Sequence, residues 1–189
     1  MEHIVPLASL DEFFHDALAR AIRNQGLSAA AEVEAYLVHL LSAFSTSAPD
    51  DSPLGVKLAS AATAAPEERI QTLRDVGDTS LYLSGFFAES LSRRLVDIDY
   101  YISLGGSAYG QLARAYERKK TAAAGVFDEL GHHFGDYVEV LAEVSQTASL
   151  STPSGVVQLY ERWLKTGSGW AERRLRKSGV VPRRGGEPD

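Results

Sequence analysis

The sequence predicts an all-α fold, a single-domain helical bundle of about seven or eight helices. Apolar residues recur at spacings of three and four along most of the chain, and no stretch of useful length alternates between apolar and polar residues. The composition, with 44% hydrophobic and 23% charged residues over 189 positions, is that of a globular protein long enough to bury a core. We therefore expect one helical domain over residues 1–181.

Two antiparallel helices are expected at the N-terminus. The first is predicted over residues 10–25, with a capping box that begins at Ser9 and a C-terminal stop at Gly26. Ser28 is expected to cap a second helix that ends near Phe44. The loop between them is short, so the two helices should be neighbours.

A short helix and a long helix should follow, each opened by a proline. Pro53 and Pro66 stand where helices are expected to begin, because proline is tolerated at the first helical position. The apolar pattern of the second continues past Gly77 to about Leu91, which predicts one long helix. A break at Gly77-Asp78 is the alternative.

The next helix, expected to start from an N-cap at Asp97, is rich in glycine and aromatic residues. It contains Gly105, Gly106 and Gly110, and glycine inside a helix costs about 1 kcal/mol relative to alanine. Close approach of another helix would compensate, and Gly85 is the expected point of contact. We predict that this helix and the preceding long one form the centre of the bundle.

The remainder of the chain predicts more amphipathic helices and a tail. Two segments, 121–133 and 134–146, have helical periodicity, with a bend expected near Gly135. Two further helices are expected, ending at Gly167 and near Lys177. Residues 182–189 lack hydrophobic side chains and are expected to be a disordered tail.

Composition limits the classes of function. The chain has no cysteine, which excludes disulfides, thiolate nucleophiles and thiolate metal ligands. The N-terminus has no basic region followed by an apolar one, and no uncharged run reaches the ~18–20 residues of a membrane span. We therefore expect a cytoplasmic protein. Residues 1–161 carry 11 Lys and Arg against 22 Asp and Glu, whereas residues 162–189 carry 8 against 3, so an acidic body precedes a basic C-terminus.

Short catalytic signatures are missing from the sequence. Neither a P-loop nor a dinucleotide-binding fingerprint occurs. Gly105-Gly106-Ser107 begins like a nucleophile elbow, but it ends in Tyr109 and lies in a predicted helix without a preceding strand. We favour a non-enzymatic protein-interaction or regulatory module that needs no cofactor.

The expected partner-binding surface is aromatic and includes a loop with two arginines. A helix that is apolar around most of its circumference is central, and any face that the bundle leaves uncovered becomes an interface. The partner would be another protein or a second copy of the chain, which would make a homodimer. The residues expected on this surface are Tyr82, Phe86, Phe87, Arg93, Arg94, Tyr100 and Tyr101.

A metal-binding bundle is the first alternative. Glu12 and His15 form one Glu-x-x-His pair, and Glu129 and His132 form another. Ferritin-like bundles build di-metal carboxylate sites from two such pairs and two further glutamates. Pairs of this kind also arise by chance, and the alternative requires the two pairs to face each other in the folded chain.

Nucleic-acid binding is the second alternative. The last two predicted helices have the outline of a helix-turn-helix with a basic second helix. The acidic body opposes this interpretation, because it repels phosphate. The residues that would bind phosphate are Arg173, Arg174, Arg176, Lys177, Arg183 and Arg184.

Overall fold

All regular secondary structure in the described part of the chain is helical, as the sequence predicts. The computed structural model describes residues 7–47, 49, 52–86 and 98–150, together with Tyr160, Glu172, Leu175 and Arg176. These residues form seven helices and no strand. The chain divides into two compact units, Met1–Val144 and Ser145–Asp189, and the first is described here. The single domain over residues 1–181 stays a prediction.

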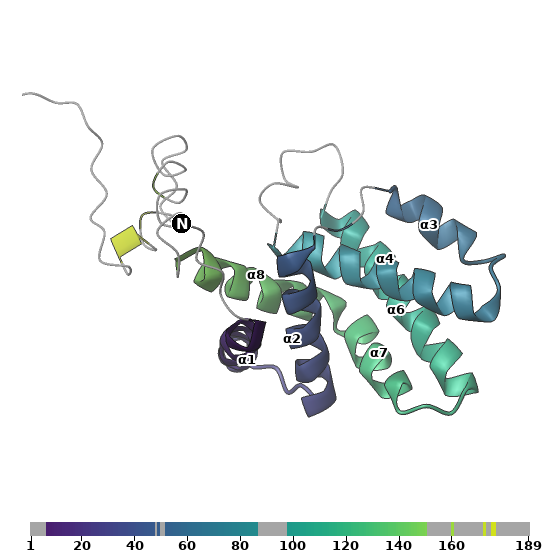
Figure 1. Ribbon diagram of the computed structural model, residues 1–189, viewed down its shortest axis with the longest axis horizontal. Coiled ribbons are helices and arrows are strands. Elements are labelled where there is room, and N and C mark those ends of the chain that lie inside the picture. Colours follow the sequence, from purple (N-terminus) through teal and green to yellow (C-terminus); the bar gives the residue numbers. More distant parts are fainter. Residues whose placement is uncertain are drawn as a thin grey trace, which may run out of the picture. The chain divides into compact units, whose positions relative to one another are not determined.

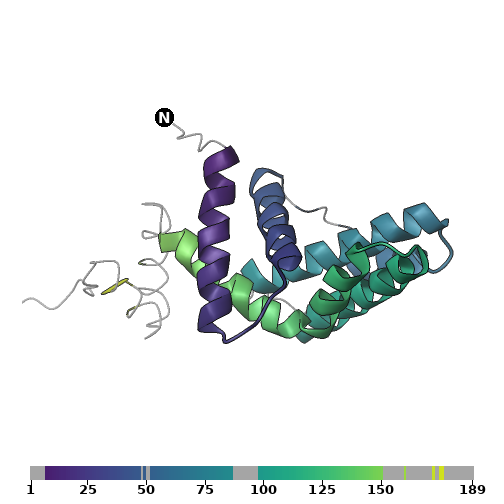
Figure 2. The same ribbon diagram turned by 90° about the horizontal axis from the view of Figure 1, so that it is seen from below.

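Helices α1 (Leu7–Asn24) and α2 (Ala31–Thr46) form the expected antiparallel pair, which Figure 2 shows side by side. The turn between them is built on Gly26, which has a φ of +69°. The N–H of Gly26 donates to Arg23 O and the N–H of Leu27 donates to Ile22 O, at 3.1 Å each. This is a Schellman ending of α1, so the predicted stop at Gly26 is confirmed.

The predicted starts of both helices are wrong. Helix α1 already includes Leu7, so Ser9 lies inside the helix and not at a capping position. The N-cap of α2 is Ala30 and not Ser28. The Ala30 side chain makes no capping hydrogen bond. The Ala30 backbone N–H donates instead to the Glu129 carboxylate at 3.3 Å. This contact spans 99 positions, and local sequence patterns do not contain it.

Helices α3 (Leu54–Ser60) and α4 (Pro66–Phe86) follow. Pro66 is the first residue of α4, as expected, whereas Pro53 occupies the N-cap of α3 and not its first turn. Helix α4 continues through Gly77 without a break. The extension that the sequence predicts as far as Leu91 lies outside the described residues, as does the expected cap at Asp97.

Helix α6 (Ile98–Arg118) packs along α4, and these two helices are the central pair (Figure 1). Gly105 is the close-contact position: a Cβ there would overlap the Phe134 ring and lie 2.8 Å from the Ser80 Cβ. The expected partner, Gly85, lies elsewhere, because a Cβ on it would be 2.5 Å from the Leu141 Cβ. The prediction of a tight contact at Gly105 is confirmed and that of its partner is wrong.

Helices α7 (Ala123–His132) and α8 (Phe134–Leu150) complete the described fold. The chain bends between them at His133, with a φ of −105°, and not at Gly135. Helix α7 approaches α6 closely through Gly131, where a Cβ would lie 3.1 Å from the Gly110 backbone nitrogen. The absence of a side chain at Gly131 allows this backbone contact.

The hydrophobic core draws on every long helix of the first unit. Residues without solvent exposure include Leu18, Leu37, Leu73, Tyr109 and Leu141, one each from α1, α2, α4, α6 and α8. None of the described helices is both long and apolar enough to cross a membrane. The two helices expected between residues 153 and 177 and the tail at 182–189 fall outside the residues that can be described, apart from four isolated positions.

Candidate functional site

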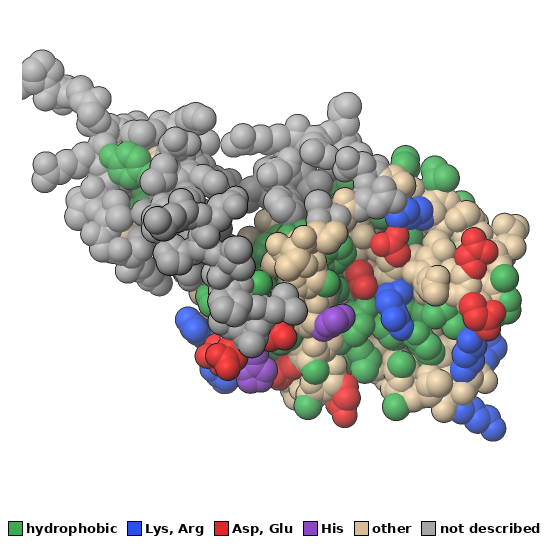
Figure 3. All heavy atoms as spheres, viewed as in Figure 1, with side chains coloured by type: hydrophobic (Ala, Val, Ile, Leu, Met, Phe, Trp, Pro, Cys, Tyr) green, Lys and Arg blue, Asp and Glu red, His purple; other side chains and the backbone are tan. Residues whose placement is uncertain are grey.

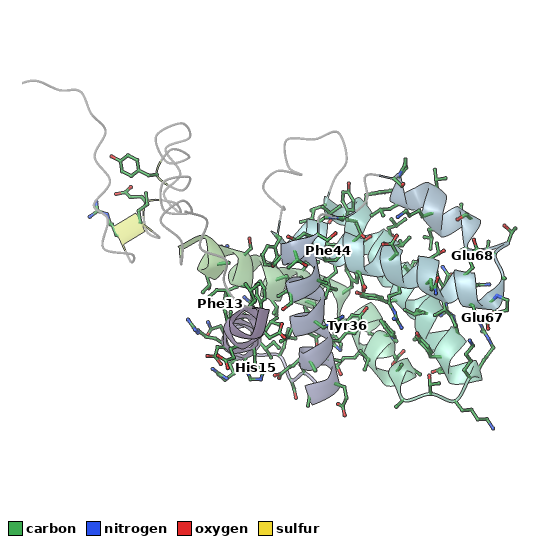
Figure 4. All side chains as sticks on the ribbon, in the orientation of Figure 1. Phe13, His15, Tyr36, Phe44, Glu67 and Glu68 are labelled. Atoms are coloured by element: carbon green, nitrogen blue, oxygen red, sulfur yellow. The ribbon has the colours of Figure 1, made fainter. Side chains whose placement is uncertain are left out.

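A carboxylate shared by three helices is the most unusual feature of the first unit. Asp78 lies on α4 and is half-buried. Its Oδ1 accepts hydrogen bonds from the Tyr36 hydroxyl of α2 at 2.5 Å and the Tyr109 hydroxyl of α6 at 2.7 Å. Tyr36 lies on the side of α2 that faces α4 (Figure 4). The two tyrosines therefore hold one oxygen of a single carboxylate between three helices.

Gly77 positions one of these tyrosines. A Cβ at residue 77 would overlap the Tyr109 ring, so only glycine lets that ring lie against the backbone of α4. The ring is completely buried, and it contacts Phe127 and Phe134 with centroid distances of 5.5 and 5.7 Å. Packing on all sides fixes the ring, which places its hydroxyl beside Asp78.

Burial raises the pKa of the Asp78 carboxyl from 3.8 to about 6. The hydrogen bonds from Tyr36 and Tyr109 and the positive charge of Arg74 act in the opposite direction and keep the pKa from rising further, whereas the nearby Asp75 raises it. Burial, together with the adjacent carboxylate, also raises the pKa of both tyrosines. At neutral pH, Asp78 is therefore mostly ionised, and both hydroxyls are protonated donors.

Asp78 also lines a groove between α4 and the C-terminal end of α6, which we call the Asp78 groove. It has a volume of about 500 Å³. Its walls consist of residues at helical spacing on α4 and of Tyr116 and Lys119. The residues from α4 include Ile70, Gln71, Arg74 and Asp78.

Most charges of the Asp78 groove already have a partner. Asp75 Oδ2 lies 2.5 Å from Lys57 Nζ, and Glu67 Oε1 lies 3.6 Å from Lys119 Nζ. Figure 3 shows acidic and basic side chains interspersed on one face of the described part. Within the described residues, no lysine or arginine forms an ion pair with Asp78.

Arg74 is engaged by aromatic side chains. Its guanidinium donates a hydrogen bond to the Tyr116 hydroxyl, and its Cζ lies 5.9 Å from the Tyr116 ring centroid and 5.6 Å from that of Phe127. These are cation–π distances. Arg74 therefore influences Asp78 through its charge without contacting it as an ion pair.

The expected partner-binding residues do not form one exposed surface among the described positions. Tyr82 is only 8% exposed and stacks on Phe44 and Phe86, with centroids 4.6 and 5.1 Å apart. Tyr100 is 45% exposed, and its ring lies edge-on to that of Tyr101, with centroids 5.5 Å apart. Phe87, Arg93 and Arg94 lie outside the described residues.

The two Glu-x-x-His pairs are not assembled into a metal site. Glu12 and His15 are exposed on α1, where Figure 4 labels His15, and His15 lies 3.6 Å from Asp16. His132 is exposed on α7, with Nδ1 2.9 Å from the Asp128 carbonyl oxygen. Among the described residues, no three His, Asp or Glu side chains gather in a group that could hold a metal ion.

Glu129 has a structural role instead. Its Oε1 accepts a hydrogen bond from the Tyr137 hydroxyl at 2.5 Å, as well as the one from the Ala30 N–H at 3.3 Å. Burial, this hydrogen bond and the negative charge of Glu129 raise the pKa of Tyr137. Glu129 thus joins α7 and α8 to the start of α2.

The residues of the nucleic-acid alternative are almost all outside the described part. Arg176 is exposed and forms an ion pair with Glu172, one turn earlier, at 2.9 Å. The other five expected phosphate-binding residues lie outside the described residues, namely Arg173, Arg174, Lys177, Arg183 and Arg184.

Nothing in the sequence directly indicates the network of Tyr36, Asp78 and Tyr109. Its two hydrogen bonds join residues that are 42 and 31 positions apart, whereas helical periodicity relates residues within about two turns. One signal was available: Asp78 is the only charged residue between Val76 and Ala88 in a segment predicted to be a central helix. A charge at such a position is seldom buried without a role.

Comparison with known proteins adds no assignment. No protein-family model matches the chain, and no curated protein or solved structure matches it either.

Proposed function

We propose that the chain is a non-enzymatic protein-interaction or regulatory module, and that the Asp78 groove is its binding site. The observation that carries the proposal is the environment of Asp78. An ionised, half-buried carboxylate is held by two neutral hydroxyls and lines an open groove. Burying a charge costs free energy, so such a residue is expected where a ligand uses it.

Binding is favoured over catalysis by the composition of the groove. A carboxyl group that titrates near pH 6 would suit a general acid or base. However, no described serine, threonine, cysteine or histidine lines the Asp78 groove. The most common partners of a catalytic carboxylate are therefore missing from its walls, and recognition is the simpler role for Asp78.

The experiment is native mass spectrometry on protein purified from its own host, with two tryptophan variants for comparison. Gln71→Trp places a large ring in the groove from an exposed position. Arg114→Trp adds the same ring at an exposed position of α6 that does not line the groove. Both changes are on the surface, so both variants should fold.

We expect a bound small molecule or protein to accompany the wild-type chain and Arg114→Trp, and to be absent from Gln71→Trp. The proposal fails if the wild-type chain carries nothing bound, or if Gln71→Trp retains the same species. A mass that corresponds to two copies of the chain would identify the partner as a second copy.

A further inference from the structure

The carboxylate of Asp78 forms no ion pair with a described residue, although the neighbouring acids do. Asp75 is 2.5 Å from Lys57, and Glu67 is 3.6 Å from Lys119. Asp78 receives only two neutral donors, Tyr36 and Tyr109. Both of these bonds go to Oδ1, so the second carboxylate oxygen is left for another partner.

The charged groups around Asp78 do not supply that partner. On its own helix, Arg74 is held by Tyr116 and faces two aromatic rings, and Asp75 has the same sign of charge as Asp78. Helices α2 and α6 contribute the hydroxyls of Tyr36 and Tyr109. The uncharged Phe127 of α7 packs on both of these tyrosines, with centroids 5.1 and 5.5 Å away.

The open groove has enough volume for a small organic group. A volume of about 500 Å³ falls within the range of ligand sites, which begins at roughly 300 Å³. Ile70 provides an apolar wall beside the polar ones. An alkylammonium would place its charge at Asp78, with its chain along the groove towards Ile70, which lies about two helical turns from Asp78.

We infer that the Asp78 groove binds a primary ammonium group, carried either by a free alkylamine or by a lysine side chain of a partner protein. The inference rests on the proposed function and adds the chemistry of the ligand. An N⁺–H donor would bind the free oxygen of Asp78 through a charge-assisted hydrogen bond, which is stronger than one between neutral groups. The Tyr36 and Tyr109 hydroxyls would hold the carboxylate in place for it.

The test compares two probes of equal size and opposite charge, n-butylammonium and butyrate, by ¹H–¹⁵N NMR of the full-length protein at pH 7.5. We expect n-butylammonium to shift backbone amides of α4 near Asp78 in a saturable manner, with a dissociation constant on the order of millimolar. Butyrate should not shift these amides. Asp78→Asn should weaken n-butylammonium binding by about tenfold or more.

Glu68→Gln is the matched control, because it removes an exposed carboxylate of α4 that does not line the groove. Its affinity for n-butylammonium should stay within about threefold of wild type, since the direct contact is unchanged. A third probe, Nα-acetyl-lysine methylamide, separates the two sources of the ammonium group. Tighter binding than n-butylammonium indicates a partner's lysine, and weaker binding indicates a free amine.

Three results would overturn the inference: no saturable shift with n-butylammonium, an equal response to butyrate, or undiminished affinity in Asp78→Asn. Failure of the inference and failure of the proposed function are separable. If butyrate binds in the groove and n-butylammonium does not, the groove remains a binding site and only the charge of its ligand is wrong. The Gln71→Trp comparison tests the site itself, whatever the ligand.

Discussion

Asp78 makes the stability of the fold depend on pH in the opposite direction to most paired carboxylates. Its pKa is raised from 3.8 to about 6 in the folded chain, so the folded chain binds the proton more tightly than the unfolded chain does. Asp78 therefore adds most to the free energy of unfolding at pH values below 3.8, the pKa of its carboxyl in the unfolded chain. This stabilisation is lost as the pH rises through about 6. At neutral pH this residue costs stability.

Replacing Asp78 by asparagine should therefore stabilise the protein at neutral pH. The side chain keeps a carbonyl oxygen for Tyr36 and Tyr109 and loses the charge. We expect Asp78→Asn to exceed wild type by about 2–3 kcal/mol at pH 7.5, because each pKa unit corresponds to about 1.4 kcal/mol, and the difference should shrink towards pH 4. Urea unfolding across this pH range measures it. A difference that grows towards acidic pH would contradict the assignment.

The Tyr109 hydroxyl should lower the pKa of Asp78. Tyr109→Phe removes one of the two donors to Oδ1, so the pKa of Asp78 should rise above 6, as measured by ¹³C NMR of the side-chain carboxyl. The unfolding free energy should fall by about 1–3 kcal/mol. Tyr137→Phe is the control, because it removes a hydroxyl that donates to Glu129. If the pKa of Asp78 changed equally in Tyr109→Phe and Tyr137→Phe, the change would not come from the hydrogen bond between Tyr109 and Asp78.

At the scale of elements, the sequence identifies helices better than their beginnings. Pro66 and Gly26 mark a start and an end correctly, because each residue's backbone preference acts at its own position. Ser9 and Ser28 also fit a capping pattern, yet neither caps a helix. The start of α2 instead has a hydrogen bond from the Ala30 N–H to Glu129, which is remote in sequence.

Two glycines of α6 should respond to alanine in opposite ways. At Gly105 a Cβ would meet Phe134 and Ser80, so Gly105→Ala should destabilise the protein by about 1–3 kcal/mol through overpacking. At Gly110 a Cβ would have no atom within 4 Å, so Gly110→Ala should stabilise it by about 0.5–1 kcal/mol through helix propensity. Denaturant unfolding of both variants measures these changes in the free energy of unfolding. Equal effects would show that the close contact at Gly105 is not formed.

The candidate site was less predictable than the helices because it is made of contacts between elements. Sequence reasoning placed Tyr82 and Tyr100 together on an expected surface, but one is in the core and the other is exposed. Both belong to glycine- and aromatic-rich helices that were correctly expected at the centre. Which side of each helix stays uncovered depends on how the neighbouring helices pack, and the periodicity of a single helix does not contain that information.

At the scale of the whole molecule, the first unit contains its own hydrophobic core. The described members of the core cluster all lie between Phe14 and Val144. A chain truncated after Leu150, the last residue of α8, should therefore remain helical and unfold cooperatively, with a melting temperature within about 5 °C of full length. Circular dichroism of both chains measures this. A non-cooperative transition would favour the single domain expected over residues 1–181.

The order of packing along the chain has a consequence for folding kinetics. The described helices pack mainly on their neighbours in sequence, as α1 does on α2, α4 on α6 and α6 on α7. Such topologies have low contact order and fold in milliseconds or less. The bond from Tyr36 to Asp78 closes a loop of 42 residues, so it should form after the helix pairs. In stopped-flow experiments, a change in pH should then alter the unfolding rate more than the folding rate, because the hydrogen bond from Tyr36 to Asp78 is expected to form late.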